Sequence, residues 1–149
     1  MIDDRSATEL RESVMALARQ MRRHRPDNGL TLSQMEVLGE VSRTGVIAPV
    51  ELATRMHVRV QSLTDSINEL ASRGLVARRP DPADRRRQLI EPTPAGTTLL
   101  ADDRAERDAW LDTTMRDNLS RLEFDLLMLV APVLRKLAYA EGKVGTLPS

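Results

Sequence analysis

The sequence predicts a mainly α-helical fold that carries one small β-hairpin. Over most of the chain, apolar residues recur every three or four positions, which is typical of helices with one buried face. Only 2% of the 149 residues are aromatic, so the core depends on aliphatic and methionine side chains, which favours packing of helix on helix. Residues 75–91 break the helical pattern and read as two short strands around a turn.

Length and composition indicate one compact unit with helical arms. A chain of 149 residues suits a single domain, and a hydrophobic content of 41% excludes wholesale disorder. All three aromatic residues fall in the last third of the chain, which we expect to have its own packing role. They are Trp110, Phe124 and Tyr139.

The first two helices are marked by their ends. An apolar stripe predicts a first helix over residues 7–25, and the turn residues Pro26 to Gly29 end it. Thr31 followed by Gln34 is a capping box, so a second helix is expected to begin there. Gly45 should end that helix.

Two short helices should follow. Pro49 suits the first position of a third helix that runs to about Met56, with Ala48 as a weak cap. The fourth helix is expected over residues 60–72, and Gly74 suits the left-handed position that ends it. Its inward face shows the spacing of four and three: Leu63, Ile67 and Leu70.

The rest of the chain is expected to form the hairpin and two longer helices. The strands are predicted over residues 75–79 and 88–91, and Thr93 should cap a fifth, highly charged helix. Ser120 and Glu123 form a second capping box, which opens a sixth helix that Pro132 should kink. Because that helix is apolar around most of its girth, we expect a partner chain to cover it. The tail over residues 142–149 is expected to be loose.

Charge is distributed unevenly along a chain whose net charge is zero. Between Thr54 and Gln88 there are eight arginines and four acidic residues, so this segment carries a charge of +4. A local basic patch on a neutral protein fits a surface that faces phosphate, although a solvated loop would look similar. Three consecutive arginines, residues 85–87, fall at the tip of the predicted hairpin.

The order of three helices followed by two strands is that of a winged helix-turn-helix. In such folds the second helix of the turn motif, here the fourth helix, lies in the major groove of DNA. Ser62 and Thr64 on that helix can contact base edges or phosphates, and the arginine loop can reach an adjacent minor groove. The fold class we predict is therefore a winged helix-turn-helix flanked by N- and C-terminal helices.

The sequence resembles the multiple antibiotic resistance regulator (MarR) family of transcription factors. The resemblance is strongest over residues 30–100, in the stretches LTLSQMEVL, PVELATRM and NELASRGLVARRPDPADRRRQLIEPTPAG. It implies a homodimer that binds a pseudo-palindromic DNA operator as a repressor, often released by a small aromatic or phenolic compound. It also implies a division into an N-terminal dimerisation helix (1–29), a DNA-binding lobe (30–96) and a C-terminal dimerisation segment (97–149).

The resemblance also implies roles for particular residues. Ser62 and Thr64 match the family's hydroxyl-rich recognition helix, and Asp84 and Arg86 match its wing Asp-x-Arg. A carboxylate beside a guanidinium would fix the rotamer of Arg86, although either neighbouring arginine could be the groove contact instead. The full set expected to contact DNA is Arg59, Gln61, Ser62, Thr64, Asp65, Arg85, Arg86 and Arg87.

The chain departs from the family pattern at two positions. Arg59 precedes the fourth helix where the family often has a serine cap, so the helix should begin without one. Asp65 stands where a basic or neutral residue is common. A carboxylate near phosphates is costly unless it accepts from a cytosine amino group or pairs with an arginine.

Other classes of protein are less well supported. The two histidines have no metal-ligand spacing, and no phosphate loop or nucleophile motif is present, so we expect no enzyme, metal or cofactor. The open alternatives are a winged helix used for protein contact and a DNA-binding protein that responds to no ligand. The chain has no cysteine, no apolar run near the ~20 residues that span a membrane and no secretory signal, so a cytoplasmic location is expected.

Overall fold

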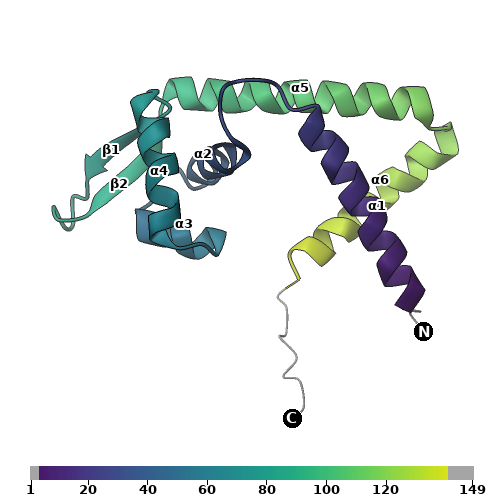
Figure 1. Ribbon diagram of the computed structural model, residues 1–149, viewed down its shortest axis with the longest axis horizontal. Helices are drawn as coiled ribbons and strands as arrows, with labels where there is room; N and C mark the ends of the chain where they lie inside the picture. The colour runs from purple at the N-terminus through teal and green to yellow at the C-terminus, as the bar shows by residue number, and fades with distance from the viewer. Residues whose placement is uncertain (1–3, 141–149) are drawn as a thin grey trace, which may run out of the picture. The chain divides into compact units, whose positions relative to one another are not determined.

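The computed structural model describes residues 4–140 and divides into two compact units, residues 1–108 and 109–149. The first unit contains the helix-turn-helix and the hairpin, and Figure 1 shows the hairpin lying beside α4. The elements in chain order are α1 (Asp4–Arg23), α2 (Leu32–Thr44), α3 (Pro49–Met56), α4 (Val60–Ser72), β1 (Val76–Pro80), β2 (Gln88–Pro92), α5 (Pro94–Asn118) and α6 (Arg121–Ala138). The mainly helical fold with one antiparallel hairpin is therefore confirmed.

The predicted caps are present. The backbone N–H of Gln34 donates to Thr31 Oγ1 at 3.2 Å, and the Thr31 N–H donates to Gln34 Oε1 at 2.9 Å, which closes the capping box of α2. Gly45 follows α2 with a φ of +87°. Pro49 is the first residue of α3, and Ala48 caps it without a side-chain hydrogen bond. Local sequence therefore sets these boundaries.

The end of α4 explains why β1 begins one residue later than predicted. The N–H of Gly74 donates to Ala71 O and that of Leu75 donates to Leu70 O at 2.9 Å, the paired bonds of a Schellman motif. Gly74 has a φ of +70°, as expected. Because the Leu75 amide is bonded to the end of α4, Leu75 does not join the ladder, which pairs residues 76–80 with 88–92.

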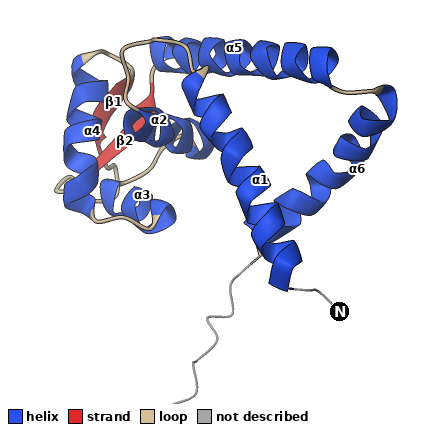
Figure 2. Ribbon diagram, turned by 45° about the vertical axis from the view of Figure 1, so that its right-hand side comes forward, coloured by secondary structure: helices blue, strands red, loops and turns tan. Residues whose placement is uncertain are grey.

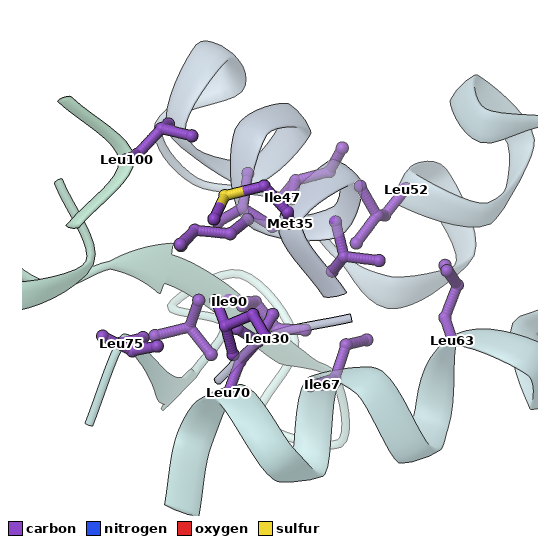
Figure 3. Packing of buried hydrophobic residues seen from close by; sticks show 14 of the residues in the cluster. Leu30, Met35, Ile47, Leu52, Leu63, Ile67, Leu70, Leu75, Ile90 and Leu100 are labelled. Atoms are coloured by element: carbon purple, nitrogen blue, oxygen red, sulfur yellow. The ribbon is translucent and has the colours of Figure 1, made fainter. Parts of the chain in front are cut away.

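One hydrophobic core joins the helix-turn-helix to the hairpin. Figure 3 shows Leu63, Ile67 and Leu70 of α4 directed at side chains of α2, α3 and the wing. The strand residue Ile90 is buried in this core, and its backbone pairs with Ile47 through hydrogen bonds of 2.8 and 3.0 Å. The middle of β2 is therefore fixed to the segment between α2 and α3; Figure 2 shows the two strands next to α4 and α2.

A buried polar contact ties the linker between α1 and α2 to α5. The side chain of Asp103 is fully buried and accepts a hydrogen bond at 3.0 Å from Asn28 Nδ2. Arg107 Nη2 lies 2.7 Å from the other carboxylate oxygen, an ion pair without hydrogen-bond alignment. Two paired groups thus balance a carboxylate that would be costly to bury alone.

The helices outside this core leave apolar side chains in solvent. In α1, Leu10, Val14 and Leu17 are exposed along the predicted stripe, although the helix spans residues 4–23 rather than 7–25. In the second unit, α6 has its predicted capping box at Ser120, contains Pro132 and has no fully buried residue. Its exposed apolar residues are Leu122, Leu126, Met128, Leu129, Val130, Val133 and Leu137. The predicted loose tail lies outside the described residues.

Candidate nucleic-acid interface

The outer face of α4 is polar and open to solvent. Its inner face is held by the core, so the helix presents its outer residues at fixed backbone positions. Thr64 Oγ1 donates to Val60 O at 3.2 Å, whereas the Ser62 hydroxyl has no partner among the described residues. The exposed residues of this face include all four that the sequence singled out on the helix: Gln61, Ser62, Thr64 and Asp65.

The start of α4 also matches the sequence prediction. Arg59 is the N-cap residue and makes no capping hydrogen bond, so the first backbone amides of the helix lack a side-chain acceptor. Such amides, together with the positive end of the helix dipole, favour an anion such as a DNA phosphate. Arg59 is exposed and stands at this end of the helix.

The tip of the wing is an ordered turn, but Asp84 supports it differently from the prediction. We expected its carboxylate to contact the Arg86 guanidinium. Instead, Asp84 Oδ1 accepts from the backbone N–H of Arg86 at 3.0 Å, and Asp84 O accepts from the N–H of Arg87 at 2.9 Å. The short Asp side chain reaches the nearby backbone in a turn more readily than a distant guanidinium, so Asp84 fixes the loop and leaves Arg86 free.

The arginines of this lobe fall into two groups. Six of them are tied to protein partners: Arg43 and Arg55 to Glu40, Arg73 to Glu69, Arg78 to Asn68, Arg79 to Glu91 and Arg87 to Glu51. The guanidinium groups of the remaining three have no ion pair or hydrogen bond within residues 4–140, and all three are exposed: Arg59, Arg85 and Arg86. Unpaired exposed arginines beside a polar recognition helix are suited to phosphates and groove edges.

The structure brings together residues that sequence reasoning did not connect. Arg87 Nη2 donates to Glu51 Oε1 at 3.1 Å, across 36 positions of the chain. The sequence contains no local signal for this pair, because both residues look like ordinary surface charges in their own segments. Asp65 has no partner in the described part of the chain, so the expected arginine pairing is not made there.

Two of the hollows in the first unit lie between different elements of the fold. One, of about 220 Å³, lies between the start of α3, α4 and the wing, and Pro49, Val60, Thr64, Ile67, Arg78, Gln88 and Ile90 line it. The other, of about 600 Å³, lies between the linker after α1 and the start of α5. Four carboxylates line the larger hollow, from Asp27, Asp102, Asp103 and Glu106.

No group of three or more His, Asp or Glu side chains within residues 4–140 is placed to hold a metal ion. None of the helices in the same range is long and apolar enough to cross a membrane.

The buried core of α2, α3 and α4, the polar outer face of α4 and the arginine-tipped hairpin define a winged helix-turn-helix DNA-binding protein. Residues 28–87 match the sequence model of the MarR family. An HTH-type transcriptional regulator of Mycobacterium bovis is 36% identical over 135 residues, which cover 91% of this chain and 94% of that protein. The chain therefore belongs to the MarR family and is a DNA-binding transcriptional regulator, not an enzyme.

Solved structures agree with this assignment. A crystal structure of a transcriptional regulator from Pseudomonas aeruginosa has a TM-score of 0.82 and 34% identity, and it covers 91% of this chain and 94% of that one. The apo form of MarR from Escherichia coli has a TM-score of 0.74 and covers 92% and 97% of the two chains. At 23% identity, that second likeness concerns the fold alone.

Proposed function

We propose that the protein is a dimeric repressor located in the cytoplasm that binds a pseudo-palindromic operator, with α4 in the major groove and the wing in the flanking minor groove. The observation that carries this proposal is the exposure of three arginines without a partner in residues 4–140, one at the start of α4 and two at the tip of the wing. Two recognition helices in a dimer would then meet half-sites about 34–36 Å apart, one turn of B-DNA.

The exposed faces of α1 and α6 support the dimer. Monomeric proteins rarely leave a long apolar stripe in solvent, and both helices do so. A twofold dimer buries the same stripe on both chains, so one set of residues serves twice. We infer that residues 1–29 and 97–149 supply the dimer contacts and residues 30–96 contact the DNA.

Individual contacts follow from chemistry. We assign Arg59 to a phosphate at the start of α4, and Gln61, Ser62 and Thr64 to base edges or phosphates. Because Asp65 has no arginine partner within the described residues, we assign it to the amino group of a cytosine, which is the base edge that a carboxylate accepts from.

We also propose that a one-ring aromatic or phenolic compound releases the DNA from the smaller hollow. Ile67, Val60 and Ile90 offer apolar walls there, while Thr64 and Arg78 offer polar groups for a hydroxyl or carboxylate. A ligand in that hollow would touch α4 directly, so it could favour a helix position that does not fit the groove. The larger hollow would repel an aromatic acid, because four carboxylates line it.

A gel shift with the upstream DNA of the protein's own gene tests DNA binding. Excess nonspecific competitor should leave a discrete band, and the Arg86→Ala variant should lower affinity and reduce the slope of log K against log salt by about one. Arg79→Ala is the matched control, since it removes the same charge from a side chain already paired with Glu91, and its effect should be smaller. Equal effects of the two variants would contradict the role of Arg86.

A further inference from the structure

Arg87 differs from its two neighbours at the tip of the wing. The guanidinium groups of Arg85 and Arg86 have no partner within residues 4–140, but that of Arg87 is turned toward the helix-turn-helix. Its Nη2 donates to Glu51 Oε1 at 3.1 Å, and its Nε lies 4.0 Å from Asp81 Oδ2. The side chain thus lies between the first turn of α3 and the turn of the wing itself.

The backbone of Arg87 also closes the wing turn. Its N–H donates to Asp84 O at 2.9 Å, and its carbonyl accepts from the N–H of Asp81 at 3.0 Å. Because the backbone of Arg87 is part of this closed turn, a contact that holds the Arg87 side chain also restricts the position of the whole tip. Arg85 and Arg86 belong to the same turn, so they move with it.

The second strand of the hairpin is already fixed at its middle residue. The paired backbones of Ile47 and Ile90 anchor it to the segment between α2 and α3, with hydrogen bonds of 3.0 and 2.8 Å. The part of a two-stranded hairpin beyond such an anchor can still bend and twist. The Arg87–Glu51 pair adds a second point of attachment, nearer the tip, on α3.

Glu51 is a suitable anchor for this contact. It lies in the first turn of α3, where the positive end of the helix dipole stabilises a carboxylate. Pairing with Arg87 also offsets a negative charge that would otherwise stand unbalanced on the lobe that meets phosphates. Neither role requires Arg87 to reach the DNA.

We propose that Arg87 is a positioning residue: it braces the wing against α3 through Glu51 and so sets where Arg85 and Arg86 stand relative to the outer face of α4. This inference rests on the proposed binding of DNA by the wing. Both partners are solvent-exposed, with side-chain exposures of 48% and 60%, so the brace restricts the wing without being essential to the fold. It acts by lowering the ordering cost of binding.

Limited digestion with trypsin tests the brace without DNA. The variant Glu51→Ala keeps every arginine of the wing, and loss of the brace should speed cleavage after Arg85 and Arg86 by about 1.5- to 5-fold. Glu36→Ala is the matched control: it removes an exposed carboxylate of α2 that has no ion pair among the described residues. Equal cleavage rates in the two variants would overturn the proposal.

A second experiment separates bracing from direct contact. The probe is a duplex selected from a random-sequence library by the unaltered protein. Arg87→Ala and Glu51→Ala should each weaken binding by about 1.5- to 5-fold, with no change in the salt slope, and the double variant should be no weaker than either. If instead Arg87→Ala lowers the slope by about one and Glu51→Ala tightens binding, Arg87 contacts phosphate and the brace is wrong.

The two experiments distinguish failure of this proposal from failure of the proposed function. If the library yields no enriched duplex, DNA reading by the wing is contradicted, whereas the trypsin result still reports on the contact between Arg87 and Glu51. If a duplex is enriched but the Glu51→Ala variant is cleaved like Glu36→Ala and binds the duplex as tightly as the unaltered protein, only the brace is contradicted.

Discussion

Replacing Gly96 with alanine should destabilise the protein through one close backbone contact. Gly96 lies in the first turn of α5, where a Cβ atom would stand 2.0 Å from Leu75 O and 2.9 Å from the Leu75 carbonyl carbon. The same atom would be 3.2 Å from Leu38 Cδ1. Because backbone atoms cannot turn aside as a side-chain end can, α5 must move away from the start of the wing.

The size of the effect follows from two opposing terms. Overpacking of this kind costs about 3 kcal/mol, at the upper end of the usual range, because the clash is with backbone. Alanine regains up to ~1 kcal/mol in a helix relative to glycine. We therefore expect a net loss of about 2–3 kcal/mol, which lowers the Tm of a chain of this size by roughly 4–12 °C.

Thermal and urea unfolding at a fixed protein concentration measure this loss. Gly39→Ala is a matched control, because Gly39 lies within α2 and a Cβ there meets nothing within 4 Å. That variant should raise stability by roughly 0.5–1 kcal/mol. A Gly96→Ala protein as stable as the unaltered chain would refute the close approach of α5 to Leu75.

Three further predictions concern charge and assembly. Arg107→Ala should lower the free energy of unfolding by roughly 1–3 kcal/mol, because it leaves the buried carboxylate of Asp103 without its cation. Arg107 is partly exposed, so the loss stays below that of a fully buried pair. An unchanged midpoint in chemical unfolding would contradict this. Hydrogen bonding from Arg43 holds the pKa of Glu40 below its usual value. The stability that Glu40 contributes is therefore fully present when the pH is above the usual pKa of a glutamate, and it is lost as the pH falls through the lowered pKa. Glu40→Gln should therefore be less stable than the unaltered protein by up to ~1 kcal/mol at pH 7, and this difference in unfolding free energy should disappear in acid. A difference that grows in acid would contradict the prediction. Leu129 is 72% exposed, so Leu129→Arg should leave the chain folded but shift it from dimer to monomer in light scattering, and a persistent dimer would exclude α6 from the interface.

Local signals in the sequence predicted most of the fold. The capping boxes at Thr31 and Ser120 and the left-handed Gly74 depend on residues a few positions apart, so the amino-acid sequence alone defines the helix ends at these positions. β1 begins one residue later than predicted because the amide of Leu75 completes α4. Strand propensity does not show that the helix end and the strand compete for this amide.

The site was predictable in composition but not in its pairings. The polar face of α4 and the three arginines at the tip of the wing could be named from the sequence, and all of them are exposed in the structure. Which arginine is free depends on partners far away in the chain, as with Arg87 and Glu51, and exposed charges carry no pattern that predicts such pairs. The role of Asp84 was misjudged for a related reason, since its nearest donor is a backbone amide.

Selection of bound fragments from sheared genomic DNA, followed by footprinting, tests the central claim most directly. If α4 and the wing of each subunit read DNA, the protein should enrich a small set of fragments that share an inverted repeat. Its two half-sites should be centred about one helical turn apart, and the Arg86→Ala variant should lose the flanking minor-groove protection. Enrichment no greater than that of random fragments, with no protected repeat, would contradict sequence-specific reading by this winged helix.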